Sequence, residues 1–154
     1  MAVTSGTGRH RARRNAMMVL YKLDLVGPED GAAGDASVTA AIDSFEREHG
    51  FALPDYAALL VRGVCGTLGA VDRGIEAHLT DWRLDRLGAV ERAILRIGMF
   101  ELVASDVPRE VVIDEAIELA KRYASPEAAK LVNGVLGAWV RSHPAPPGKE
   151  QEDE

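Results

Sequence analysis

The segment that most constrains the fold is residues 89–104, which is apolar on nearly every side of a helical projection. Its apolar residues are Ala93, Ile94, Leu95, Ile97, Met99, Phe100, Leu102 and Val103. A helix that is apolar all round has to be covered on every side by other elements. We therefore expect this segment to be the central buried helix of the fold.

The rest of the chain shows helical periodicity and no convincing strand. Apolar residues recur at spacings of three and four, and Gly or Pro marks most of the ends. The predicted helices cover residues 9–26, 37–49, 54–79, 89–104, 108–124 and 125–142, with a short turn or helix at 81–88. Glycines 63, 66 and 69 within the third helix either let a neighbouring helix approach or mark a break. The prediction is an all-α bundle of about six or seven helices over residues 9–143, with disordered tails at 1–8 and 144–154.

Charge is distributed unevenly along the chain. The first 20 residues contain four arginines and no acid, so the remainder has a net charge of −10 against −6 for all 154 residues. A basic arm on an acidic body is typical of a protein whose arm meets an anion, often nucleic acid. The acidic body argues against unspecific coating of DNA.

Cysteine usage and hydropathy indicate the compartment. Cys65 is the single cysteine, so it cannot form an internal disulfide. No apolar stretch approaches the ~18 residues that a membrane span needs. These two features predict a protein of the reduced cytoplasm, with no membrane partner.

The predicted first helix carries a candidate RNA-binding face. At ~100° per residue, five residues fall opposite its apolar stripe: Arg11, Arg14, Met18, Tyr21 and Lys22. The cations suit phosphates, and the tyrosine ring offers a surface on which a base can stack. The alternative is an ordinary solvated helix face. Arg9 and Arg13 lie closer to the apolar stripe, and Arg13 is equally a candidate for a structural ion pair.

Catalysis and metal binding have little support. Glu115 and Glu118 are one helical turn apart, as a catalytic carboxylate pair would be, but no nucleophile motif or Gly-rich phosphate loop accompanies them. The four histidines have no ligand-like spacing. We predict no enzymatic activity, no cofactor and no metal. Arg96 and Glu101 lie in the most apolar helix, where a charge is normally paired, so both are predicted to be internal ion-pair residues.

Four segments of the chain resemble the NusB family. They are Arg-Ala-Arg at 11–13 with Leu-Tyr at 20–21, Asp-Trp-Arg-Leu-Asp-Arg-Leu at 81–87, the run from Val90 through Phe-Glu-Leu at 100–102 to Asp-Val-Pro at 106–108, and Val-Ile-Asp-Glu-Ala-Ile-Glu-Leu-Ala-Lys at 112–121 followed by Val-Asn-Gly-Val-Leu at 132–136. Their order and spacing are similar to the family's over roughly residues 9–140.

The resemblance implies an all-helical protein without an active site. It implies binding to the boxA element of ribosomal RNA leader transcripts together with NusE, a protein of the small ribosomal subunit. It also implies a place in the RNA polymerase antitermination complex. The candidate RNA-binding residues are then Arg9, Arg11, Arg13, Arg14, Tyr21 and Lys22 on the first helix and Leu131 and Asn133 on the last.

The last helix departs from the family pattern at one position. The family usually has Phe immediately before the Val-Asn-Gly-Val-Leu run, where this chain has Leu131. Leucine can pack against a base but has no aromatic face. Asn133 is a candidate for hydrogen bonding to RNA, and its alternative is a buried hydrogen bond between helices beside Gly134, whose missing side chain would permit close packing.

The resemblance places the NusE surface on the acidic side of the molecule, away from the basic arm. Asp85 and Glu91 are its candidate contacts, because an acidic body suits a basic ribosomal protein. Leu131 supports an alternative function, a protein–protein adaptor with little RNA affinity. A fragment of a ribosomal RNA cytosine methyltransferase with a NusB-like domain is disfavoured, since we expect no cofactor-binding α/β domain after this one. A homodimer stays open.

Overall fold

The computed structural model describes residues 6–26, 34–80 and 83–145. Its elements are α1 (Gly6–Val26), α2 (Asp35–His49), α3 (Asp55–Gly66), α4 (Leu68–Glu76), the 3-10 helix η1 (Leu84–Arg86), α5 (Ala89–Ala104), α6 (Arg109–Tyr123) and α7 (Pro126–Ser142). No strand occurs in these residues, which confirms the predicted all-α bundle. Residues 1–5 and 146–154, most of the two predicted tails, lie outside the described residues, as do residues 27–33 and 81–82.

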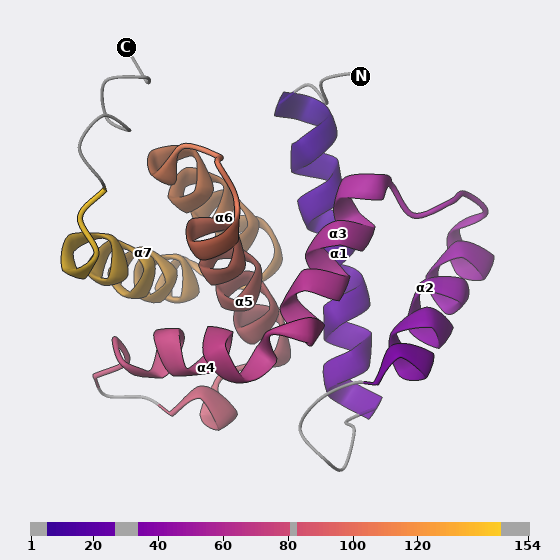
Figure 1. Ribbon diagram of the computed structural model, residues 1–154, viewed down its shortest axis with the longest axis horizontal. Coiled ribbons are helices and arrows are strands. Elements are labelled where there is room, and N and C mark those ends of the chain that lie inside the picture. Colours follow the sequence, from indigo (N-terminus) through magenta and orange to yellow (C-terminus); the bar gives the residue numbers. More distant parts are fainter. Residues whose placement is uncertain (1–5, 27–33, 81–82, 146–154) are drawn as a thin grey trace.

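Helix α5 is the centre of the bundle, as predicted. It packs against α1, α3, α4, α6 and α7, and eight of its residues are buried. Figure 1 shows it between the pair α6 and α7 on one side and the crossing helices α1 and α3 on the other. The expectation that its apolar residues would be covered on every side is wrong at Val103, which is 64% exposed in the last turn, where α5 emerges from the bundle.

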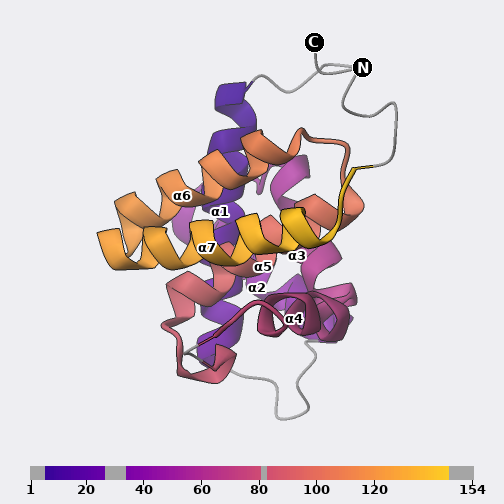
Figure 2. The same cartoon turned by 90° about the vertical axis from the view of Figure 1, so that its left-hand side faces the viewer.

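The remaining helices form two groups around α5. Helices α6 and α7 run side by side along one flank (Figure 2). Helix α1 packs against α2 and α3 on the other flank. No helix among the residues described has the length and apolar character needed to cross a bilayer.

The predicted single helix over residues 54–79 is instead two helices, α3 and α4, which meet at Thr67. Thr67 leaves the helical conformation at φ −129°, and its hydroxyl donates to the carbonyl of Gly63 at 2.7 Å. A threonine hydroxyl that bonds back to the preceding turn, next to a residue of low helix propensity such as Gly66, favours a break.

Gly63 has a different role from Gly66. A Cβ added at Gly63 would lie 2.1 Å from the ring of Phe100, so the glycine permits the close approach of α3 to α5. A Cβ at Gly66 would meet nothing within 4 Å. Both interpretations of the glycines are therefore correct: Gly63 permits the close approach of a neighbouring helix, and Gly66 lies at the break between α3 and α4.

Several helix ends follow the sequence signals closely. The Ser125 hydroxyl accepts a hydrogen bond from the backbone N–H of Ala128 at 3.0 Å and caps α7, whose first residue is Pro126. Gly50 ends α2 in the left-handed region at φ 75°, which glycine adopts without strain. Starts are less exact: α1 begins three residues before its predicted start and α2 two residues before.

Candidate nucleic-acid interface

The inner face of α1 is fixed by a buried ion pair. Arg13 is 2% exposed and Glu101 of α5 is 1% exposed. The Nε and Nη2 atoms of Arg13 donate to Oε1 and Oε2 of Glu101 at 2.8 and 2.9 Å. Of the two roles predicted for Arg13, the structure therefore shows the ion pair. The predicted pairing of Glu101 is confirmed, and because the Arg13 guanidinium is buried and engaged, we leave it out of the candidate interface.

Tyr56 of α3 completes this cluster. Its hydroxyl donates to Oε2 of Glu101 at 2.5 Å. Burial and then the hydrogen bond to the Glu101 carboxylate raise the pKa of Tyr56 well above its ordinary value. Burial alone would lower the pKa of Arg13, but the hydrogen bond and charge of Glu101 outweigh it, so the pKa of Arg13 is raised. The cluster thus holds a charged arginine and a neutral tyrosine around Glu101.

The outer face of α1 is accessible, as the helical projection predicts. Arg11 and Tyr21 are exposed and Arg14 is half-buried. The projection is less exact at Met18, which is half-buried and packs against the core. Neither Arg11 nor Arg14 has an ion-pair partner among the described residues. We call the face formed by Arg11, Arg14, Met18, Tyr21 and Leu25 the α1 outer face.

Leu25 was missed by the sequence analysis. It is 63% exposed and follows Tyr21 by four residues, one helical turn, on the same face. The helical projection continued for one further turn would have found it. An exposed leucine beside an exposed tyrosine enlarges the surface available to a base.

Lys22 differs from Arg11 and Arg14 because it already has an ion-pair partner. Its ammonium donates to Oε1 of Glu48 on α2, and this ion pair is largely exposed. The hydrogen bond from Lys22 lowers the pKa of Glu48. A phosphate would have to compete with this carboxylate, so Lys22 is a weaker candidate than Arg11 or Arg14.

Arg9 and His10 face the neighbouring helices at the start of α1. The Arg9 guanidinium carbon lies 4.9 Å from the centroid of the Tyr56 ring. Its Nε is buried and has no hydrogen-bond partner in the described part of the chain. The Nδ1 atom of His10 lies 2.5 Å from Oε2 of Glu115 on α6, whereas Glu118 is exposed, so these two carboxylates have different surroundings.

The two candidates on α7 lie at different depths. Leu131 is half-buried against the core, whereas Asn133 is exposed. The alternative of a buried hydrogen bond for Asn133 is therefore wrong. A Cβ at Gly134 would meet nothing within 4 Å, so no neighbouring helix approaches there.

Leu131 and Glu91 line one pocket of about 230 Å³ between the start of α5 and the start of α7. Its other lining residues are Arg86, Leu87, Ser125, Glu127 and Ala128. The Glu91 carboxylate also accepts the backbone N–H of Gly88 at 3.0 Å and so caps α5. A residue predicted to border RNA and a residue predicted to contact a partner protein are thus adjacent.

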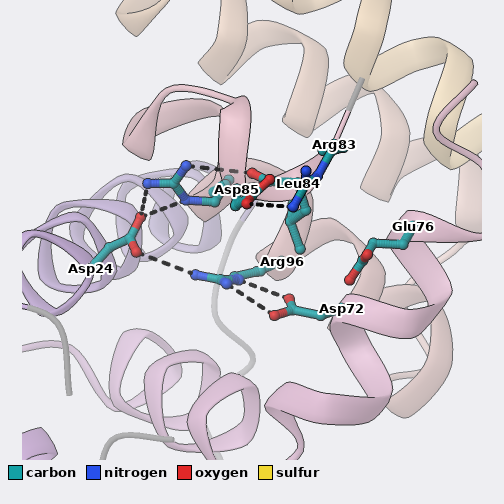
Figure 3. A pocket seen from close by; sticks show the side chains of 8 residues that line it. Asp24, Asp72, Glu76, Arg83, Leu84, Asp85 and Arg96 are labelled. Carbon is teal, nitrogen blue, oxygen red and sulfur yellow. Dashed lines mark hydrogen bonds and ion pairs between the residues drawn. The ribbon is translucent and has the colours of Figure 1, made fainter. Parts of the chain in front are cut away.

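Asp85 lies on a second pocket, of about 470 Å³, at the far end of α1 (Figure 3). Arg96 crosses this pocket and donates to both oxygens of Asp72 at 2.9 and 3.0 Å, and its Nη1 lies 3.9 Å from Asp24. Arg92 binds the same Asp24 at 2.7 Å. The predicted ion pairing of Arg96 is confirmed, with partners on α4 and α1.

The position of Asp24 shows where Asp85, a predicted contact of the partner protein, lies relative to α1. Asp24 is in the last turn of α1, so Asp85 lies far from Arg9 and Arg11 but beside the end of the helix that carries Tyr21. The surface is separate from the basic arm and adjacent to the rest of the same helix. Within the described residues, no group of three or more His, Cys, Asp or Glu side chains is arranged to hold a metal ion.

Comparison with protein families gives one match over most of the chain. The model of the NusB family matches residues 10–141. The protein called transcription antitermination protein NusB from Anaeromyxobacter dehalogenans (strain 2CP-1 / ATCC BAA-258) is 45% identical over 130 residues, which cover 83% of this chain and 87% of that protein.

Solved structures show the same fold. One is T. maritima NusB, with 30% identity, a TM-score of 0.71, and coverage of 93% of this chain and 96% of that one. Another is a chain from the crystal structure of antitermination factors NusB and NusE in complex with dsRNA. It has 33% identity, a TM-score of 0.73, and coverage of 88% of this chain and 98% of that one.

Proposed function

Because the chain belongs to the NusB family, we propose that it is a transcription antitermination factor that binds boxA RNA of ribosomal RNA leader transcripts together with NusE. In this proposal it is a binding factor of the cytoplasm and not an enzyme. It brings RNA and NusE to the RNA polymerase antitermination complex. The relative solved with NusE and dsRNA supports both partners.

The observation that carries RNA binding is the α1 outer face. Arg11 and Arg14 have no ion-pair partner in the described part of the chain and lie one turn apart, and Tyr21 and Leu25 continue the same face. When a cation without an ion-pair partner meets a phosphate, counterions bound to the RNA are released, which favours binding. An exposed ring next to such cations can stack on an unpaired base. A flexible RNA strand laid along this helix would use both kinds of contact.

The pocket that contains Leu131 supports a second RNA contact. Leu87, Ala128 and Leu131 are its apolar lining residues, and Glu91 and Glu127 add two carboxylates to the lining. Those carboxylates accept hydrogen bonds, so they would favour a base edge with amino groups over a phosphate. Asn133 is exposed but does not line this pocket, because two residues along α7 place it on the other side of the helix from Leu131.

The proposal for NusE rests on charge. Asp85 is exposed and lines a pocket together with Asp24, Asp72 and Glu76, and Arg83, Arg92 and Arg96 line the same pocket, which therefore has one more acid than base. This small excess of negative charge would attract a basic ribosomal protein to this end of the molecule. Because Glu91 lines the neighbouring pocket, NusE bound here would also lie close to RNA held at Leu131, which suits joint binding.

A protein–protein adaptor with little RNA affinity is the second candidate. Two observations favour it: Leu131 offers no aromatic face, and Lys22 is paired with Glu48. Both reduce the RNA contacts that the first helix and the last helix could otherwise provide.

A fluorescence titration of labelled boxA RNA, with and without NusE, separates the two candidates. The RNA-binding proposal expects affinity for boxA RNA alone that increases when NusE is added, and weaker binding to a scrambled RNA of equal length. The adaptor proposal expects NusE binding with no measurable RNA binding. Sizing chromatography of the same samples tests for a homodimer, which would have to leave the α1 outer face free.

A further inference from the structure

Arg9 is held at the start of α1 by an aromatic ring. Its guanidinium carbon lies 4.9 Å from the Tyr56 centroid, within the range of a cation–π contact. Its Nε is the buried side-chain polar atom that lacks a hydrogen-bond partner among the described residues. Such an atom calls for an explanation, because buried donors in folded proteins are nearly always paired.

The ring that holds Arg9 is itself rigidly placed. The Tyr56 hydroxyl donates to Glu101 at 2.5 Å, and Glu101 is fixed by two hydrogen bonds from Arg13. The Arg13 guanidinium carbon also lies 5.8 Å from the Tyr56 centroid. Two buried groups, Glu101 and Arg13, therefore determine where the ring lies, and the ring determines where the Arg9 side chain lies.

We propose that Tyr56 is a positioning residue for RNA binding, which holds the Arg9 guanidinium so that its amino groups meet an RNA phosphate at the start of α1. This inference rests on the proposed function. Arg9 is only half-buried, and its Nη atoms have no partner in the described part of the molecule, so they are the donors left for a ligand. A phosphate accepts such donors in pairs.

Preorganisation is the physical advantage of this arrangement. A free arginine on a helix loses side-chain freedom when it binds a phosphate, whereas an arginine already held against a ring loses less. Tyr56 would thus improve RNA affinity without touching RNA. A purely structural cation–π contact would instead stabilise α1 and leave RNA affinity unchanged in folded protein.

A double-mutant cycle on boxA RNA affinity tests this inference, with NusE present throughout. Tyr56→Leu removes the ring, and Tyr56→Phe keeps the ring but removes the hydroxyl. Each is measured in the wild-type and in the Arg9→Ala background, with circular dichroism and a thermal melt for every variant. We expect Tyr56→Leu to weaken RNA binding by about threefold to tenfold in the wild-type background. The same change should have no further effect once Arg9 is alanine.

Three outcomes would overturn the inference. One is an equal loss of affinity from Tyr56→Leu in both backgrounds, which would show that position 56 acts on RNA independently of Arg9. Another is unchanged affinity in a folded Tyr56→Leu protein. The third outcome applies if Tyr56→Leu does not fold, in which case Tyr56→Phe is measured instead. Tyr56→Phe should cause a smaller loss of RNA affinity, which disappears in the Arg9→Ala background. An equal effect of Tyr56→Phe in both backgrounds would reject the proposal.

The cycle also separates the inference from the function on which it rests. If Arg11→Ala with Arg14→Ala weakens RNA binding but positions 56 and 9 are uncoupled, the RNA-binding proposal holds and the role of Tyr56 is wrong. If wild-type protein with NusE does not bind boxA RNA, both are wrong.

Discussion

Arg13 and Glu101, 88 residues apart in the sequence, form a two-point ion pair inside the core and join α1 to α5. Together with the buried apolar residues Ala12, Ala16, Met17, Val19 and Leu20, the pair holds the inner face of α1 against the core. Arg11 and Arg14 therefore lie on the opposite, outer face.

Removing one member of this pair should destabilise the protein strongly. Glu101→Gln leaves the Arg13 charge buried without a counter-charge, and we expect a loss of about 3–5 kcal/mol in the free energy of unfolding. The matched control is Asp85→Asn, which breaks an exposed pair with Arg83 and should cost at most about 1 kcal/mol. Urea denaturation measures both, and a Glu101→Gln protein as stable as the control would show that the pair does not anchor α1.

The raised pKa of Tyr56 predicts a loss of stability in alkali. The folded-state pKa of Tyr56 lies above its unfolded value, so the protonated hydroxyl stabilises the folded protein. This stabilisation is complete below a pH of about 10 and is lost as the pH rises through the folded pKa, by up to about 1.4 kcal/mol per pH unit. Tyr56→Phe cannot titrate. The difference in unfolding free energy between wild type and Tyr56→Phe should therefore be constant from pH 7 to 9 and decrease above pH 10. A difference that stays flat to pH 11.5 contradicts this account.

Local signals in the sequence were sufficient for most of the fold. The apolar run of α5, the cap at Ser125 and the stop at Gly50 each act within a few residues, so they could be recognised without knowing the tertiary structure. The break at Thr67 was harder, since it depends on a side-chain bond to Gly63 that competes with the helix.

Long-range pairing was the part of the site that the sequence could not specify. Charge in an apolar helix predicted that Arg96 and Glu101 would be paired, but the partners Asp72 and Arg13 come from other helices. The pairing of Lys22 with Glu48 was missed for the same reason, because α2 lies beside α1 only after folding.

Replacing Leu131 with phenylalanine should tighten RNA binding. The residue is half-buried at a pocket of about 230 Å³, where a ring could offer a stacking face to a base. We expect a gain of about 1 kcal/mol, the low end of a stacking contact, because leucine already packs there. Leu59→Phe on α3 is the control for added aromatic surface, since Leu59 is 53% exposed on another helix. Equal effects from both variants, measured by boxA titration, would remove Leu131 from the RNA site.

Reversing Asp85 and Glu91 to lysine should weaken NusE binding, mainly through slower association at low salt. Because Glu91 caps α5, the double variant should also lose about 1 kcal/mol of stability, a shift of only a few degrees in Tm. Asp114→Lys with Glu118→Lys, two exposed acids on α6, makes the same change in net charge elsewhere. Surface plasmon resonance measures the rate of association with NusE for both variants. If the α6 variant associates as slowly as the Asp85 and Glu91 variant, NusE is attracted by net charge and not by this surface.

The salt dependence of boxA affinity tests the central claim, that the α1 outer face is the RNA site. Arg11→Ala with Arg14→Ala should weaken binding and flatten the plot of log affinity against log salt by about 1.4, at roughly 0.7 for each phosphate contact. Tyr21→Ala should cost about 1–3 kcal/mol at every salt concentration with the slope little changed. Lys22→Ala should change the slope by less than either arginine, because Glu48 already pairs with it. If the double arginine variant binds boxA RNA like wild type at low salt, α1 is not the RNA site and the adaptor function replaces the one proposed.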